Sequence, residues 1–405
     1  MLRRKAADAL KHWVRTKDRK CLVLQGARQT GKTYIVERFA EENFEELLEI
    51  NFKEMPSAKE IFAGDLTVDT MVMAMRFRFP EKQIQPGKTL IFLDEIQECE
   101  EAITSLKFWA IDQRFDVIAS GSLLGIDYKR ASSYPIGYVD YYEMHGLDFE
   151  EFLWGMGISE DMIGELRTFL QTKKAIPEAI HTQMMSYYRR YIAIGGMPEA
   201  VQKYMDTKDF REVDRIQRNL LQGYLYDIAH YASAEEKVKA EKCYLSLGKQ
   251  LLDKENHKFQ YKEIEHGARA QKYYSSIEWL LRADMVHLSR RVTDVRFDLD
   301  DYARDDFFRA YTTDLSLLLA MKDFSLKQRI VENTLTGSSK GGFFECAIAD
   351  ALYKKGYALY FYKNETNTRE IDVIIQKDGE VVPIEIKSGN TRANSLKSLM
   401  KNHED

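Results

Sequence analysis

The residues best suited to chemistry lie in a glycine-rich segment, Gly26–Thr33, with the sequence GARQTGKT. This segment fits the pattern G-x-x-x-x-G-K-[ST], whose backbone N–H groups surround a polyphosphate. Lys32 is then expected to reach the β- and γ-phosphates of ATP, and the Thr33 hydroxyl to bind Mg²⁺. The rest of the predicted nucleotide-binding loop consists of Gly26, Ala27, Arg28, Gln29, Thr30 and Gly31. The alternative is a glycine turn before an ordinary helix.

A second candidate is the acidic pair Asp94 and Glu95, which ends the apolar run TLIFLDE at Thr89–Glu95. The apolar run predicts a buried parallel strand. Carboxylates at its C-terminal end lie where open α/β sheets bind their ligands. We expect Asp94 to hold Mg²⁺ through water and Glu95 to polarise the attacking water. A solvated strand end is the alternative, but the phosphate-binding pattern upstream favours catalysis.

Small polar residues end another apolar run, Phe115–Ser122, with the sequence FDVIASGS. Ser120 or Ser122 could sense the γ-phosphate by hydrogen bonding. A polar strand end without function remains the alternative for both serines.

The elements that must position these residues follow from periodicity. Lys20–Gln25 and Leu47–Phe52 are short apolar runs typical of buried strands, and Thr33–Glu42 has helical spacing. Met1–Lys20 predicts an amphipathic helix. A strand, a glycine loop and a helix in this order predict an α/β fold with a P-loop nucleotide-binding core.

Composition sets further limits. The chain has 405 residues, of which 44% are hydrophobic and 30% charged, so we expect roughly two to four globular domains. A net charge of −5 excludes a wholly basic nucleic-acid binder but allows a local basic patch. The four cysteines are widely spaced, which indicates free thiols in a reducing compartment. No apolar run approaches the ~20 residues that cross a bilayer, so a cytoplasmic protein without membrane contact is expected.

Five motifs in a fixed order give a family resemblance: GARQTGKT, LDEIQ at 93–97, ASGSLLG at 119–125, LDFEEFL at 147–153 and GGMPEA at 195–200. The chain resembles the prokaryotic AAA+-type ATPases whose C-terminal half carries a domain of unknown function. This resemblance implies a five-stranded AAA+ core and the sensor role for Ser120. In the family a glycine and a basic residue follow GSLLG, as a candidate arginine finger. Here Tyr138 follows Gly137, which argues against self-activation in trans.

The middle of the chain predicts helices, followed by a possible nucleic-acid-binding region. Phe149 to about Ala232 has helical spacing, broken at Met197-Pro198. Between Phe259 and Arg296, two helices and an alternating segment suggest a winged helix. Arg290 and Arg291 would lie on its wing, where DNA phosphates are often contacted. Winged helices also serve as domain joints or protein contacts, so both interpretations stay open.

The last region resembles restriction-endonuclease-like domains, through Glu345 on a predicted helix and a D…ExK pattern at Asp372, Glu385 and Lys387. A hairpin turn at Asp378-Gly379 predicts that paired residue numbers sum to 757. Asp372 and Glu385 would then face each other and share a divalent metal. The alternative is a structural carboxylate pair neutralised by Lys387 and Arg369, which the early end of the expected domain favours.

These observations predict four parts: an AAA+-type ATPase core at 1–145, a helical lid or connector at 146–232, a winged-helix-like domain at 233–330, and a restriction-endonuclease-like α/β domain at 331–405, possibly truncated. The expected function is Mg²⁺-dependent ATP hydrolysis that switches a DNA-binding or nuclease-like C-terminal half. An ATP-controlled nuclease and a nucleotide-gated scaffold that recruits a protein partner are the alternatives. The sequence predicts no oligomeric state.

Overall fold

The structure is a computed structural model that describes residues 2–121, 135–252, 258–364, 370–387, 389, 395–397 and 399. The chain divides into two compact units, an N-terminal unit at Arg3–His145 and a C-terminal unit that starts at Gly146 and also includes Leu2. No helix among the described residues is long and apolar enough to cross a bilayer. The four cysteines are buried and free, as predicted.

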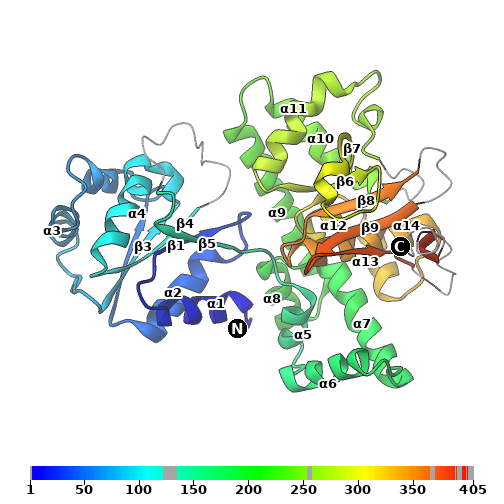
Figure 1. Ribbon diagram of the computed structural model, residues 1–405, viewed down its shortest axis with the longest axis horizontal. Coiled ribbons are helices and arrows are strands. Elements are labelled where there is room, and N and C mark those ends of the chain that lie inside the picture. The colour runs from blue at the N-terminus through cyan, green and yellow to red at the C-terminus, as the bar shows by residue number, and fades with distance from the viewer. Residues whose placement is uncertain are drawn as a thin grey trace. The chain divides into compact units, whose positions relative to one another are not determined.

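The N-terminal unit is a parallel sheet covered by helices on both faces (Figure 1). Its elements are α1 (Lys5–Arg15), β1 (Cys21–Gln25), α2 (Lys32–Asn43), β2 (Glu46–Asn51), η1 (Pro56–Phe62), α3 (Val68–Arg78), β3 (Thr89–Asp94), η2 (Ile96–Glu98), α4 (Glu100–Asp112), β4 (Asp116–Ser120) and β5 (Val139–Glu143). The strand order is β2-β3-β4-β1-β5, and all four pairings are parallel. The predicted strands after the glycine loop are therefore confirmed.

Alternation along the strands divides the core of this unit into two layers. Cys21 and Val23 of β1 pack with η1, α3 and α4, whereas Leu22 and Leu24 pack with α1 and α2. Strand β3 is buried along its whole length. Burial on both faces explains its continuous apolar run, and it places the carboxyl ends of β1, β3 and β4 at one edge of the sheet.

The C-terminal unit combines a helical region with a second sheet. Its helices are α5 (Phe149–Gly155), α6 (Glu160–Gln171), α7 (Glu178–Ile194), α8 (Pro198–Thr207), α9 (Phe210–Tyr231), α10 (Lys237–Gln250), η4 (Tyr261–Glu263), α11 (Ala270–Arg282), η5 (Leu299–Tyr302), α12 (Leu315–Ala320), α13 (Phe324–Val331) and α14 (Ser338–Tyr353). Its strands are β6 (Val286–Val292), β7 (Ala303–Thr312), β8 (Leu359–Lys363), β9 (Glu370–Lys377) and β10 (Glu380–Ile384). The predicted helical region at 149–232 is helical, and Pro198 begins α8 after the break.

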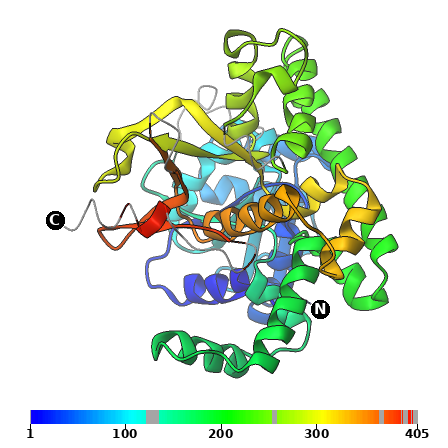
Figure 2. The same ribbon diagram turned by 90° about the vertical axis from the view of Figure 1, so that its right-hand side faces the viewer.

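The second sheet has the order β10-β9-β8-β6-β7. Strands β6 and β7 pair as an antiparallel hairpin, and β6 also pairs in parallel with β8. Strand β7 lies beyond Arg296, where the expected alternating segment ends. The expected domain boundary at 330/331 therefore separates strands that belong to one sheet. Period-2 alternation predicts a strand, but it does not show whether that strand is a free wing or lies inside a sheet. Helix α14 packs against β7 and β8 (Figure 2).

Candidate functional site

The segment Gly26–Thr33 connects β1 to α2 and needs glycine at two positions. Gly26 has φ +138°, and a Cβ atom there would lie 2.2 Å from the carbonyl oxygen of Met144. Gly31 has φ 90° and caps α2. Lys32 Nζ donates to the carbonyl oxygens of Gly26 (2.9 Å) and Ala27 (2.8 Å). The loop therefore presents a helix N-terminus and an ammonium group, which together suit a phosphate.

Asp94, at the end of β3, brings residues from four elements together. Its carboxylate accepts hydrogen bonds from Thr33 Oγ1 (3.1 Å), Asn51 Nδ2 (3.0 Å), the Glu95 backbone N–H (3.1 Å) and the Ser120 hydroxyl. Asp94 is buried, and all four donors are neutral. A hydroxyl and a carboxylate side by side are oxygen ligands of the kind that Mg²⁺ takes in phosphate-binding sites.

Glu95 adopts a left-handed backbone conformation, with φ 52°. For a residue other than glycine this conformation costs about 1–2 kcal/mol, and such strain concentrates at functional sites. The carboxylate oxygen Oε2 accepts a hydrogen bond of 2.5 Å from Gln97 Nε2. Glu95 is half-buried, so a carboxylate next to Asp94 is held in place and remains accessible to water.

Ser120 ends β4 with its side chain buried and its hydroxyl on Asp94. Ser122 and most of the GSLLG segment lie outside the described residues. Gly137 has φ +84°, and the ring centre of Tyr138 lies 5.5 Å from Lys107 Nζ. Of the two predicted sensor positions, the structure therefore shows one, next to the acidic pair.

Two residues at this site were missed by sequence reasoning. Arg4 donates to the carbonyl oxygens of Thr30 (3.0 Å), inside the loop, and His145 (2.6 Å), just after β5. No local pattern marks Arg4, because its partners are far away in the sequence. Asn51 carried a weak signal, since it is a polar residue at the end of an apolar strand.

The predicted hairpin register in the C-terminal sheet is confirmed: Glu380 pairs with Lys377 and Ile384 with Val373, so each pair sums to 757. The ladder ends at this last pair. Beyond it, Asp372 Oδ2 accepts a 2.6 Å hydrogen bond from the Ile386 backbone N–H.

The predicted metal site is not formed: the guanidinium of Arg309 contacts Glu345, and the Asp372 and Glu385 carboxylates have other partners. Arg309, on β7, donates to Glu345 Oε1 (2.9 Å) and to the Asp372 backbone oxygen (3.0 Å), and it pairs with Glu370. Tyr311 also donates to Glu345, at 3.0 Å. Among the described residues, no three His, Cys, Asp or Glu side chains are arranged to hold a metal ion.

The other members of the D…ExK pattern are engaged nearby. Glu385 pairs with Lys387 at 2.7 Å and accepts from the Leu396 backbone N–H at 3.0 Å. Burial raises the pKa of Asp372, and the nearby Glu345 raises it further. These contacts match the structural alternative for the carboxylates: Lys387 pairs with Glu385 as expected, and Arg309 is a further cation, at Glu345 and Glu370. Arg369 lies outside the described residues.

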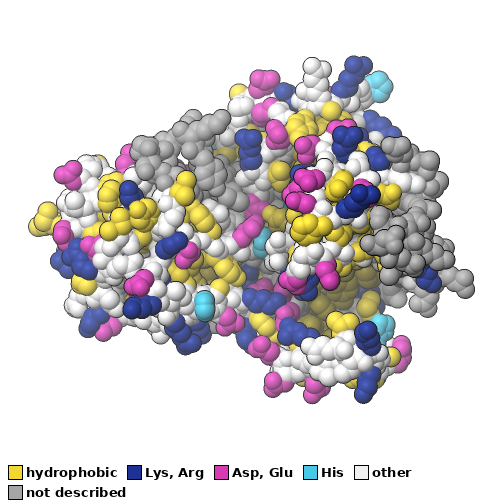
Figure 3. Space-filling view, in the orientation of Figure 1, with side chains coloured by type: hydrophobic (Ala, Val, Ile, Leu, Met, Phe, Trp, Pro, Cys, Tyr) yellow, Lys and Arg dark blue, Asp and Glu magenta, His cyan; other side chains and the backbone are white. Residues whose placement is uncertain are grey.

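Arg290 and Arg291 do not lie on a wing, because β6 is an interior strand. Arg290 pairs with Asp300 at 2.5 Å, and Arg291 donates to the Lys363 backbone oxygen at 2.9 Å. Residues 290–306 contain six aspartates and four arginines. Acidic and basic side chains are also interspersed over the visible face of this unit (Figure 3). Both arginines are half-buried and have partners within the fold, so these contacts give no support to a phosphate-binding role.

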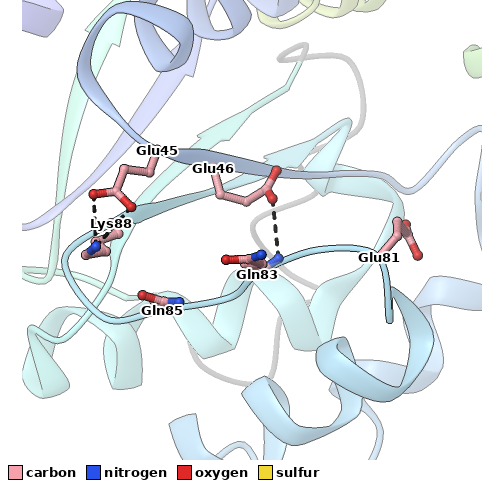
Figure 4. Close-up of a pocket in the computed structure, with 6 residues that line it drawn as sticks. All are labelled: Glu45, Glu46, Glu81, Gln83, Gln85 and Lys88. Atoms are coloured by element: carbon pink, nitrogen blue, oxygen red, sulfur yellow. Dashed lines mark hydrogen bonds and ion pairs between the residues drawn. The ribbon is translucent and has the colours of Figure 1, made fainter.

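A polar pocket in the N-terminal unit lies at the starts of β2 and β3, at the sheet edge opposite the glycine loop (Figure 4). Three of its four charged residues form ion pairs: Lys88 with Glu45 at 2.9 Å, and Glu46 with Lys82 at 2.8 Å. Ligands of parallel sheets bind at the carboxyl ends of the strands, so we assign no function to this pocket.

Three known families match successive parts of the chain. Residues 18–153 match the family described as AAA domain. Residues 185–328 match a domain of unknown function, DUF8612, and residues 340–405 match another, DUF4143. No curated protein matches the chain.

Solved structures with a similar fold include a Walker-type ATPase of Pyrococcus abyssi, with 13% identity and a TM-score of 0.44 over 79% of this chain and 96% of that one. AMPPCP-bound DnaA of Aquifex aeolicus has 11% identity and a TM-score of 0.32, over 69% and 87% of the two chains. The ORC1 protein of Aeropyrum pernix in complex with DNA has 14% identity and a TM-score of 0.27, over 82% and 93%. With scores this low, the assignment rests on the family matches and on the site. The chain is a P-loop protein of the AAA+ type, with an N-terminal AAA domain followed by C-terminal domains of unknown function.

Proposed function

We propose that the protein binds ATP with Mg²⁺ in the Gly26–Thr33 loop and hydrolyses it. The observation that carries this proposal is the 3.1 Å hydrogen bond between Thr33 and Asp94, which brings the two expected metal ligands together at the start of α2. Mg²⁺, when bound, would neutralise charge on the phosphates. Lys32 would bind the β- and γ-phosphates, because its ammonium lies over the loop.

Within this proposal, Glu95 acts on the attacking water. Its carboxylate follows Asp94 directly and is anchored by Gln97. A carboxylate in this place can orient water and accept its proton, a contribution of roughly 10²–10⁴ in rate. Ser120 is the proposed sensor. Its hydroxyl donates to Asp94 and would instead donate a hydrogen bond to a γ-phosphate oxygen when ATP is bound.

We propose that the change between the ATP-bound and ADP-bound states is transmitted to the C-terminal unit through the segment 144–147. On the N-terminal side, the Met144 N–H donates to the Gln25 carbonyl at 2.7 Å, and Arg4 ties His145 to the loop. On the C-terminal side, the Leu147 N–H donates to the Gly196 carbonyl at 2.6 Å. Both ends of this short connection are hydrogen-bonded, so a shift of the loop would pull on the helical region.

Leu147 is anchored in a buried charged cluster formed by Asp314, Asp350, Lys354 and Tyr191. Its carbonyl oxygen accepts from the Tyr191 hydroxyl (2.8 Å) and from Lys354 Nζ (3.2 Å). Lys354 also pairs with Asp314 (2.9 Å) and Asp350 (2.8 Å). We propose that residues 146–232 act as a connector. The charged cluster would couple this connector to the second sheet.

Nucleic acid is the ligand class that we propose for the C-terminal unit. Support comes from three exposed cations: Lys262 on η4, Arg269 at the N-cap of α11 and Arg282 in its last turn. Exposed lysines and arginines are a common source of phosphate contacts. Nuclease activity is not part of the proposal, because Arg309 occupies the carboxylate cluster.

The test is the ATPase rate of the full chain with Mg²⁺ or with EDTA, each with duplex DNA, single-stranded DNA or RNA. We expect Mg²⁺-dependent hydrolysis that nucleic acid changes in a salt-sensitive way. No hydrolysis with Mg²⁺ would contradict the enzymatic proposal. A rate that none of the three nucleic acids changes at low salt would contradict the choice of ligand.

A further inference from the structure

A glutamine two residues after Glu95 lies between this carboxylate and the end of β4. Gln97 is part of η2, and its Nε2 donates the 2.5 Å hydrogen bond to Glu95 Oε2. Its other amide atom, Oε1, lies close to Gly121, the residue after Ser120. A Cβ atom on Gly121 would be 2.6 Å from this oxygen. Gln97 thus touches the acidic pair and the strand end that carries the proposed sensor.

The amide of Gln97 can hold the carboxylate because its own backbone is fixed. In η2 the Glu98 N–H donates to the Glu95 carbonyl and the Cys99 N–H to the Ile96 carbonyl, both at 3.0 Å. Ile96 is buried, which anchors the turn in the core. The main chain of Glu95 is held by its N–H bond to Asp94, but the side chain beyond it would rotate freely without a partner.

We propose that Gln97 is a positioning residue, which holds the Glu95 carboxylate in the orientation from which it acts on water. The inference rests on the proposed function of Glu95. Reaction rates depend steeply on such placement, and a displacement of about 1 Å can cost roughly 100-fold. Gly121 contributes to this positioning, because any side chain at residue 121 would displace the Gln97 amide.

The first test is Gln97→Ala in the full chain, with kcat and the dissociation constant for ATP measured separately. We expect kcat to fall roughly 10- to 100-fold while the dissociation constant, measured by calorimetry, stays at the parent value. Gln83→Ala is the matched control, since Gln83 is exposed in the same unit. It should leave both quantities unchanged.

The second test asks whether Gln97 acts through Glu95. Added to Glu95→Gln, Gln97→Ala should cause no further loss of kcat, because residues that act as a unit are not additive. Gly121→Ala should lower kcat in the parent but not in Gln97→Ala, where the amide has gone.

A parental kcat in Gln97→Ala would overturn the inference. So would a full additional loss in the Glu95→Gln background, or a loss of ATP binding, since these indicate a role in the fold. If Glu95→Gln itself keeps the parental kcat, the proposed role of Glu95 fails instead, and the two failures are thereby distinguished.

Discussion

The two units each contain a group of carboxylates that the sequence marks as a metal site, and their surroundings differ. Around Asp94 the donors are a threonine hydroxyl, a serine hydroxyl, an asparagine amide and a backbone N–H. Around Glu345, Glu370 and the backbone of Asp372, the donors are the buried guanidinium of Arg309 and the Tyr311 hydroxyl. The side-chain donors to Asp94 are neutral, whereas the second group contains a cation of its own.

The difference shows what decides whether acidic residues need a metal. Neutral donors orient a carboxylate without cancelling its charge, so a divalent cation still gains from binding. A buried arginine already supplies the opposite charge and would have to be displaced at a large desolvation cost. Acidic residues at a strand end predict a metal only where the fold provides no cation of its own.

The largest expected effect is on the rate of ATP hydrolysis, and it should distinguish the two groups of carboxylates. Glu95→Gln keeps the shape of the side chain and loses the carboxylate, so ATP hydrolysis should fall by roughly 10²–10⁴ with ATP binding retained. Glu385→Gln, the matching change in the C-terminal unit, should leave the hydrolysis rate unchanged. A steady-state ATPase assay measures both. Equal effects of the two substitutions would erase the distinction between the groups.

The internal cation can be removed directly. Arg309→Met removes the guanidinium from the buried Glu345 and the half-buried Glu370, which should lower the free energy of unfolding by about 3–5 kcal/mol. Urea unfolding measures this, with Arg282→Met, at an exposed position on α11, as the control. If Arg309→Met bound Mn²⁺ and the parent did not, these carboxylates would be able to bind a metal, and Arg309 would be what prevents it. A variant as stable as the parent would show that Arg309 is not the neutralising group.

The corresponding cation in the N-terminal unit should matter for ligand binding rather than for folding. Lys32→Ala removes charged hydrogen bonds to two phosphates and should weaken ATP binding by roughly 100-fold, while the thermal unfolding temperature without ATP stays similar. Lys88→Ala, at the opposite sheet edge, is the control. Calorimetry showing the parental affinity in Lys32→Ala would remove the loop from the nucleotide site.

A third group of carboxylates sharpens the comparison, since Asp314 and Asp350 share one internal ammonium, Lys354. Burial raises the pKa of Asp350 to about 7, although Lys354 opposes the rise. The pKa of Asp314 is lowered: burial acts to raise it, but Lys354 and the bonds to Ser316 outweigh that. One ammonium therefore neutralises Asp314, and Asp350 holds its proton only below about pH 7.

This arrangement predicts a pH dependence. Between about pH 4 and pH 7 folded Asp350 keeps a proton that the unfolded chain loses, so the free energy of unfolding should fall as pH rises, by up to about 1.4 kcal/mol per unit. Above pH 7 the contribution is constant. Asp350→Asn should flatten the profile in this window, as measured by denaturant unfolding. The same slope in parent and variant would mean that Asp350 is ionised in the fold.

Sequence reasoning located what is encoded locally. The glycine loop, the strand before Asp94 and the hairpin turn at Asp378-Gly379 each depend on neighbouring residues, and the fold contains all three. Arg4 and Arg309 were missed because their partners lie 26 to 141 and 36 to 63 residues away in the sequence. The pairing of β6 with β8 was missed for the same reason. Periodicity identifies a strand but does not name its neighbours.

The parallel pairing of β6 with β8 also has a consequence for how the chain is made. Strand β6 ends at Val292 and β8 begins at Leu359, so the middle of this sheet closes over a long intervening segment. Closing long loops costs entropy before contacts form. The N-terminal unit needs only residues 3–145 and can fold while synthesis continues. The second sheet must wait for its last strands, so the nascent chain carries an ATP-binding unit well before it carries the part that ATP is proposed to switch.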